Sequence, residues 1–433
     1  MFVPSARKSN PRAINRKSRR LCVLQFSTLI VAVVCLRTVA ASAAEAFEAP
    51  PRLPAQDLAP ARLTAGSGFR VESPVPTDGL MALFVIRSDV GTFKAPGLEM
   101  LRIRVAELPA IKQLQQTSKT GVFAESLAKN AARPVQAAGQ MLMNPMETVQ
   151  GLPGGVQRFF GRVGYGAQQL TQAATESDQS GAERAGTVAS RTGKAAMDIL
   201  GYEQERRELA KKLNVDPYTT NPVLVPLLDE IAKVAFTAHA GVNLAMSVAV
   251  PGSMAITGTR MVATWVWDTP RADLIVRDKN KLKELGVSDA TARAFMNNPA
   301  FPLSVQTNFV ENLSRLSGVA GAVDIVALAS TAQSEMQARF ITDTVGMLAR
   351  YHSRSPLASI IAKGTVIGRE RNGTIVVPAP VDYVSWTQRI SYFAHRSDLK
   401  APKRVAMLTG RMSPMAKRNF QKLGWTVYER TAL

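Results

Sequence analysis

The chain has 433 residues, 46% of them hydrophobic and 20% charged, which is enough for two or three domains with buried cores. Its 53 Lys and Arg residues outnumber 33 Asp and Glu residues, giving a formal net charge of +20 that favours anionic partners. Two cysteines and three histidines exclude a disulfide-rich scaffold and argue against a thiolate or histidine metal centre.

Residues 1–43 have the pattern of a secretory signal peptide. Seven basic residues lie between Arg7 and Arg20 without an acid, residues 21–36 are apolar, and Ala41-Ser42-Ala43 provides a cleavage site. We therefore expect export. A bacterial periplasm fits best, because cleavage removes both cysteines and lowers the formal charge to +12. An uncleaved anchor through residues 21–36 and a mitochondrial presequence are the alternatives.

The next region is expected to begin with a tether and continue as strands. Residues 44–64 are proline-rich and predict an extended linker. In the region 65–170, alternation over residues 68–73 and a β-type run over 80–87 flank Asp78-Gly79, which predicts a tight turn between strands. The apolar spacing of residues 98–115 predicts a helix that packs on these strands.

Two further sequence motifs resemble known functional motifs but do not match them. The glycine-rich loop 151–155 lacks the Gly-Lys-Ser/Thr of a phosphate-binding loop. Ser126-Leu127-Ala128-Lys129 has the form of an acylating motif of penicillin-binding enzymes, but Lys119-Thr120-Gly121 precedes it instead of following it. Residues 171–200 are small and polar and predict a flexible connector.

Residues 201–356 are predicted to form a helical domain. A charged helix begins near Glu203 and ends at Asp216-Pro217, and Asn221-Pro222 opens the next helix. The 26 uncharged residues 234–259 are interpreted as a buried helical hairpin, with a membrane span as the alternative. Residues 325–351 have the spacing of one long helix.

Residues 282–293 resemble the turn and second helix of a helix-turn-helix nucleic-acid reader. The simpler interpretation is a helix that ends at Gly286 and another that begins at Ser288, as in any helical hairpin. An exported chain would not meet cytoplasmic DNA, so we expect nucleic-acid binding only if the N-terminus is not a signal.

The C-terminal region 357–433 is predicted to be a small α/β domain. Asn372-Gly373 predicts a hairpin, and residues 386–395 predict a helix. A strand over 404–408, a helix opened by Ser413-Pro414 and a strand over 425–428 then form a right-handed βαβ unit.

Candidate site residues are few. The loop Thr409, Arg411 and Ser413 lies between a strand and a helix N-terminus, where backbone N–H groups favour an anion. An ordinary capped turn is the competing interpretation. Asp216 and Tyr218 form a second candidate, although Asp-Pro is also typical of turns. We predict no catalytic residue, metal or cofactor.

Two segments suggest a family. Residues 206–219, with Arg206-Arg207 and Val215-Asp216-Pro217-Tyr218-Thr219, and residues 423–427 resemble exported proteobacterial proteins of no known function. The resemblance spans most of the chain after residue 43. It implies an exported bacterial protein and says nothing of an activity.

The sequence thus predicts an α+β protein that is predominantly α-helical, with a short N-terminal β-hairpin region, a helical middle and a small C-terminal α/β (ββα-βαβ) region. The leading hypothesis for function is a non-catalytic cell-envelope protein that binds a partner or the anionic membrane surface. A periplasmic hydrolase or anion-binding protein that uses residues 357–433 is the alternative, and a nucleic-acid reader comes third. The sequence does not predict the oligomeric state.

Overall fold

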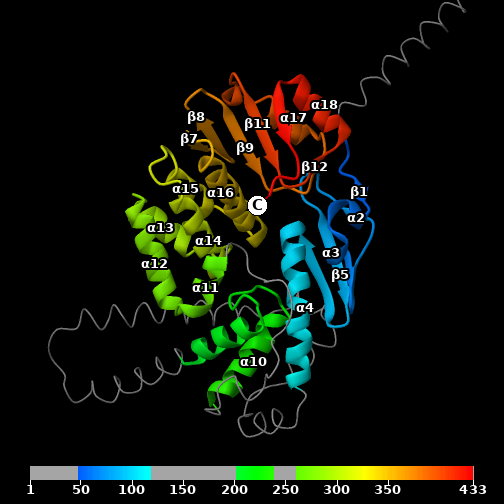
Figure 1. The fold of residues 1–433 in the computed structure, drawn as a ribbon, viewed down its shortest axis with the longest axis vertical. Coiled ribbons are helices and arrows are strands. Elements are labelled where there is room, and N and C mark those ends of the chain that lie inside the picture. The colour runs from blue at the N-terminus through cyan, green and yellow to red at the C-terminus, as the bar shows by residue number, and fades with distance from the viewer. Residues whose placement is uncertain (1–46, 119–200, 238–259, 433) are drawn as a thin grey trace, which may run out of the picture. The chain divides into compact units, whose positions relative to one another are not determined.

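The computed structural model describes residues 47–118, 201–237 and 260–432. The chain forms two compact units, residues 1–49 and 50–433, and the elements below belong to the second. Its fold is α+β, as predicted, with strands in its N-terminal and C-terminal parts (Figure 1). The predictions for the signal peptide, residues 119–170, the connector 171–200 and the uncharged residues 238–259 lie outside the described residues.

The N-terminal strands form an antiparallel sheet in the order β2-β3-β5-β6. They are β2 (Ala65–Gly66), β3 (Phe69–Val71), β5 (Leu83–Ser88) and β6 (Gly91–Pro96). The predicted turn at 78–79 is confirmed. The Asp78 carboxylate accepts hydrogen bonds from the backbone N–H of Leu80 (2.9 Å) and of Met81 (2.7 Å), and Gly79 has a φ of 89°.

The prediction of an extended tether over residues 44–64 is wrong where the structure describes it. β1 (Arg52–Leu53) pairs with β4 (Val75–Pro76), and two short helices, α2 (Ala55–Leu58) and α3 (Ala61–Thr64), follow. Each helix is preceded by a proline, whose fixed φ suits a helix start as well as an extended chain. The segment is held by burial of Ala55 and Ala59 in the N-terminal core.

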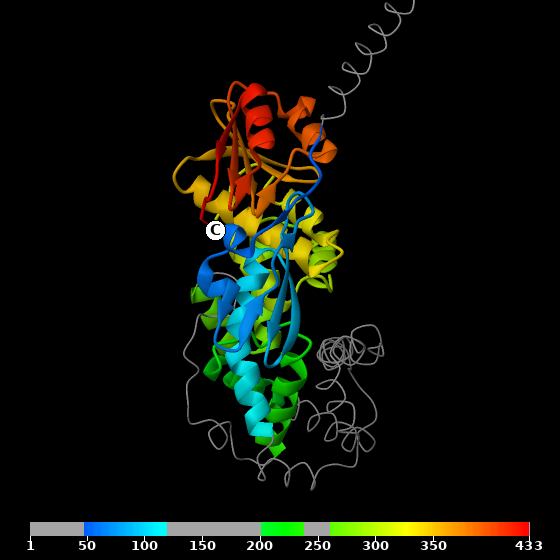
Figure 2. The same cartoon turned by 90° about the vertical axis from the view of Figure 1, so that its right-hand side faces the viewer.

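Helix α4 (Leu98–Ser118) lies along the N-terminal sheet (Figures 1 and 2). It buries the stripe that the sequence predicts, including Leu101, Leu108 and Ile111. Its other neighbours are α10 (Leu224–Thr237) and the helical residues 201–212, whose apolar side chains join the same core.

The helical middle continues with six described helices. They are α11 (Arg260–Asp268), α12 (Arg271–Glu284), α13 (Asp289–Met296), α14 (Leu303–Ser314), α15 (Asp324–Ser330) and α16 (Glu335–His352). The simpler interpretation of residues 282–293 is confirmed, because Gly286 has a φ of 85° and the Ser288 hydroxyl accepts from the N–H of Thr291. The single helix predicted over 325–351 is wrong: Ser334 caps a new helix, although the apolar spacing continues across the break.

The C-terminal region is a five-stranded sheet in the order β13-β11-β9-β8-β7, with α17 (Gln388–Ala394) and α18 (Pro414–Lys422) beside it (Figure 1). Its strands are β7 (Leu357–Ala362), β8 (Val366–Glu370), β9 (Ile375–Ala379), β11 (Arg404–Leu408) and β13 (Trp425–Tyr428). The hairpin of β8 and β9 and the parallel pair β11 and β13, joined by α18, confirm the predicted ββα-βαβ order. β7 was not predicted. A further short pair joins β10 (Tyr383–Val384) to β12 (Arg411–Met412) in parallel.

Candidate functional site

A cleft of about 220 Å³ lies between α3, the N-terminus of α4, α16 and the chain that follows β9. Much of its wall is apolar and includes Leu63, Met81, Leu98, Met336 and Phe340. Six ionisable side chains also line it: Arg62, Glu99, Arg102, Arg339, Asp343 and Asp382. A mainly apolar pocket with a few convergent polar groups is the usual form of a small-molecule site.

Asp382 joins the C-terminal region to the wall of this cleft. Its carboxylate accepts a hydrogen bond from the N–H of Ala82 (2.8 Å), 300 residues away in the sequence, and from the N–H of Leu98 (3.1 Å) at the start of α4. Burial raises the pKa of Asp382 to about 6, and these two amides limit the rise. Asp382 therefore caps α4 from a distant part of the chain.

Three arginines line the cleft: Arg62 is exposed, and the other two are already paired with carboxylates. Arg102 forms an ion pair with Glu99 at 2.7 Å on the same face of α4. Arg339, which is buried, forms an ion pair with Glu335 at 2.7 Å within α16. Despite burial, Arg339 and the hydroxyl of Thr220 hold the pKa of Glu335 below its ordinary value.

Asp343 differs from its neighbours. It lies one helical turn after Arg339 on α16, lines the cleft, and its carboxyl makes no hydrogen bond or ion pair with a described residue. Burial raises the pKa of Asp343 to about 8; the nearby Glu99 carboxylate adds to the rise, and Arg339 and Arg102 oppose it. At neutral pH, Asp343 is therefore a neutral carboxylic acid that faces the cleft and can donate a proton.

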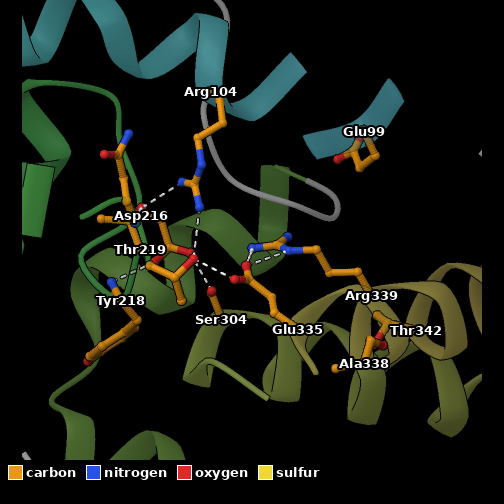
Figure 3. Close-up of polar contacts among 12 residues, drawn as sticks. Glu99, Arg104, Asp216, Tyr218, Thr219, Ser304, Glu335, Ala338, Arg339 and Thr342 are labelled. Carbon is orange, nitrogen blue, oxygen red and sulfur yellow. Dashed lines mark hydrogen bonds and ion pairs between the residues drawn. The ribbon is translucent and has the colours of Figure 1, made fainter. Parts of the chain in front are cut away.

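A partly buried polar network behind the cleft fixes α16 against α4 (Figure 3). The Thr220 hydroxyl donates to Glu335, and Arg104 of α4 donates to the same hydroxyl at 2.9 Å. Arg104 also forms an ion pair with the fully buried Glu107 at 2.8 Å, and the side-chain amide of Asn221 donates to Glu107 at 2.7 Å. Because Arg104, Glu107 and Asn221 are buried and mutually satisfied, they help to hold the helices that carry Glu99 and Asp343.

The candidates Asp216 and Tyr218 lie beside this network and do not converge on one point. The buried Asp216 carboxylate accepts from the N–H of Tyr218 (2.8 Å) and from the Ser304 hydroxyl. Burial raises the pKa of Asp216 to about 6, and those hydrogen bonds oppose the rise. The Tyr218 side chain extends away from Asp216 and Ser304 (Figure 3). Asp216 thus fixes the turn that follows the helical residues 201–212.

The side chains of the other candidate loop, Thr409, Arg411 and Ser413, bond to three different parts of the chain. The Thr409 hydroxyl, at the edge of the cleft, donates to the carbonyl of Val381 at 2.8 Å. The Arg411 guanidinium donates to the carbonyl of Asp57, and Ser413 caps α18 by accepting from the N–H of Ala416 at 3.0 Å.

The backbone donors of that loop are used internally as well. The N–H of Arg411 donates to the carbonyl of Asp382 (3.1 Å), and the N–H of Met412 donates to the Glu429 carboxylate (2.7 Å). Glu429 thus supplies an internal anion where the sequence predicts an external one. We therefore base no proposal on this loop.

Sequence reasoning missed the six ionisable side chains of the cleft. The signals that could have drawn attention to them are local: Glu99 and Arg102 are three residues apart, and Arg339 and Asp343 are four apart. Such pairs are common on exposed helices, and nothing local brings them together with Asp382.

Among the described residues, no helix is both long and apolar enough to cross a bilayer, and no acidic, histidine and cysteine side chains gather where they could hold a metal ion. Comparisons of the chain with protein-family models, with curated proteins and with solved structures found no match.

Proposed function

We propose that the protein is a non-catalytic, exported binding protein of a bacterial cell envelope, and that its cleft takes a small molecule with an amino group. The observation that carries this proposal is the Asp343 carboxyl, which faces the cleft without a hydrogen-bond or ion-pair partner among the described residues. Its neighbours Arg102 and Arg339 are already paired with carboxylates. A bound ammonium group would pair with ionised Asp343 and displace its proton.

The size of the cleft limits the ligand. An engineered apolar cavity of about 150 Å³ holds benzene, so the cleft of about 220 Å³ has room for a single ring or a short chain with a head group. The apolar lining would contact that body, and Asp343 and Glu99 would receive the cationic end. For eight non-hydrogen atoms we expect a dissociation constant of about 1 mM, or about 4 kcal/mol.

Binding is favoured over covalent catalysis by the lining itself. The described residues around the cleft include no serine, cysteine or histidine, and the Thr409 hydroxyl already donates to Val381. A nucleophile needs an adjacent base within hydrogen-bond reach, and Asp343 has no such neighbour among the described residues.

Three probes with one ring and different head groups test the proposal: benzylamine, benzamide and benzoate. Calorimetric titration near pH 8 should show benzylamine bound most tightly and benzoate least, because Asp343 and Glu99 repel a carboxylate. In Asp343→Asn the affinity for benzylamine should fall about tenfold. The control Asp289→Asn, an exposed carboxyl at the start of α13, should change nothing. Equal binding of benzoate, or unchanged benzylamine affinity in Asp343→Asn, would refute the proposal.

The location rests on the basic, apolar and small-residue segments of residues 1–43. Cell fractionation with an intact-mass measurement should find a soluble periplasmic form that begins near Ala44. Full-length protein in the membrane fraction would instead make residues 21–36 an anchor. Attachment to an anionic membrane surface stays a prediction, and release by salt would support it.

A further inference from the structure

Arg207, on the helical residues 201–212, is a buried cation without an ion-pair partner among the described residues. Its side chain is 7% exposed, and its guanidinium makes no hydrogen bond or ion pair with a described residue. The preceding Arg206 is equally buried, but it forms an ion pair with Asp229 at 2.6 Å and donates to the carbonyl of Pro217. A buried guanidinium is normally paired, because burying an isolated charge is costly.

A second buried donor lies beside it. The Tyr218 side chain is 8% exposed and its hydroxyl has no hydrogen-bond partner among the described residues. The bond from Arg206 to Pro217 places this turn next to the helix that carries Arg207. On the other side, the Arg271 guanidinium lies 5.4 Å from the centre of the Tyr218 ring.

The position of Arg271 at the start of a helix also favours a bound negative charge. Arg271 is the first residue of the 14-residue helix α12, whose N-cap Pro270 supplies no side-chain acceptor. Like Arg207, Arg271 makes no ion pair with a described residue. The N-terminus of a helix carries partial positive charge, so it adds to the attraction of the two guanidinium groups for an anion.

The opposing charges are Glu203 and Asp216. Burial raises the pKa of Tyr218 to about 12; Glu203 and Asp216 add to the rise, and Arg271 and Arg207 oppose it, so all four charges lie close to this residue. Two arginines and two carboxylates therefore act on the hydroxyl, and the Asp216 carboxylate is already held by the N–H of Tyr218 and the Ser304 hydroxyl. An oxyanion would accept two hydrogen bonds from a guanidinium and one from the tyrosine.

We propose that Arg207, Tyr218 and Arg271 form a binding site for a small oxyanion, a carboxylate or phosphate group of a ligand. This oxyanion site does not depend on the cleft at Asp343, because the Tyr218 side chain extends away from the network behind that cleft (Figure 3). The guanidinium of Arg207 would hold two oxygens, and the Tyr218 hydroxyl would donate to one of them.

Sodium acetate and sodium phosphate, titrated into the full-length protein against sodium chloride at equal ionic strength, test the site. We expect at least one oxyanion to raise the melting temperature above that in chloride. Comparing acetate with phosphate then shows whether the site prefers a carboxylate or a phosphate group. Arg207→Met should weaken that oxyanion about tenfold or more, and Tyr218→Phe about threefold. The control Arg293→Met, an exposed arginine on α13, should keep the affinity of the native protein.

Tyr218→Phe keeps the test valid if Arg207→Met does not fold. Without the oxyanion, Tyr218→Phe should be at least as stable as the native chain, because it removes a buried hydroxyl that has no partner. With the oxyanion, the variant should gain less stability than the native chain does. Equal effects of chloride, acetate and phosphate, or full oxyanion binding by both variants, would overturn the proposal.

Discussion

Replacing Asp343 by asparagine should stabilise the protein at neutral pH. The pKa of Asp343 is 3.8 in an ordinary setting and about 8 in the folded chain. At pH 7 the folded protein therefore holds a proton that the unfolded chain has released. This lowers the free energy of unfolding by about 1.4 kcal/mol for each pH unit above the ordinary pKa, or about 4 kcal/mol at pH 7. Asparagine keeps the shape and avoids this cost. Because the carboxyl is partly open to solvent, we expect a gain of about 2 kcal/mol.

The sign of the pH dependence follows from the raised pKa. The contribution of Asp343 to stability is fully present below about pH 4 and is lost as the pH rises through about 8. Urea unfolding at about pH 4, 6 and 8 should measure the difference in free energy of unfolding between Asp343→Asn and the native chain. We expect this difference to be near zero at the lowest pH and largest at the highest. The control Asp289→Asn should stay within about 0.5 kcal/mol at each pH. A pH-independent difference, or a less stable Asp343→Asn at pH 8, would refute the reasoning.

Three further substitutions, each measured by urea unfolding, test the contacts that hold the walls of the cleft in place. Asp382→Ala removes the acceptor of two backbone N–H groups and should cost about 2 kcal/mol; an unchanged midpoint would show that this cap is dispensable. Glu107→Ala leaves Arg104 buried without its partner and should cost about 3–5 kcal/mol, whereas a cost below 1 kcal/mol would contradict a buried network. Gly410→Ala places a Cβ 1.9 Å from the carbonyl oxygen of Asp382 and should cost about 2 kcal/mol, unless the loop moves freely.

Local sequence signals predicted the C-terminal region well because each element there is delimited by its own residues. Asn372-Gly373 sits between two runs of β-branched residues, and the strands β8 and β9 pair on either side of it. Ser413 caps α18, and Gly424, with a φ of 78°, ends it before β13. Such motifs act over four or five residues, so a single sequence reveals them.

The errors arise where distant contacts decide. The prolines before α2 and α3 suit an extended tether, and only the pairing of β1 with β4 and the burial of Ala55 show that the segment is packed. The break between α15 and α16 keeps the apolar spacing of one helix, so periodicity could not reveal it.

Distant contacts also decide which residues meet at the candidate sites. The sequence identified a helix N-terminus at Ser413, but Glu429, the residue after β13, accepts the N–H of Met412 just before it. The cleft residues Glu99, Asp343 and Asp382 come from two helices and a loop that tertiary packing alone brings together. Tyr218 was noticed beside Asp216, whereas its hydroxyl lies near Arg207 and Arg271.

The most direct test of the proposed function is the affinity of benzylamine as a function of pH, measured by calorimetry in buffers of different ionisation enthalpy. If the ammonium group pairs with Asp343, affinity should rise about tenfold from pH 6 to pH 7 and level off above about 8. About one proton should be released for each molecule bound at the lower pH. Affinity that does not change with pH, or binding without proton release, would contradict a ligand site built on Asp343.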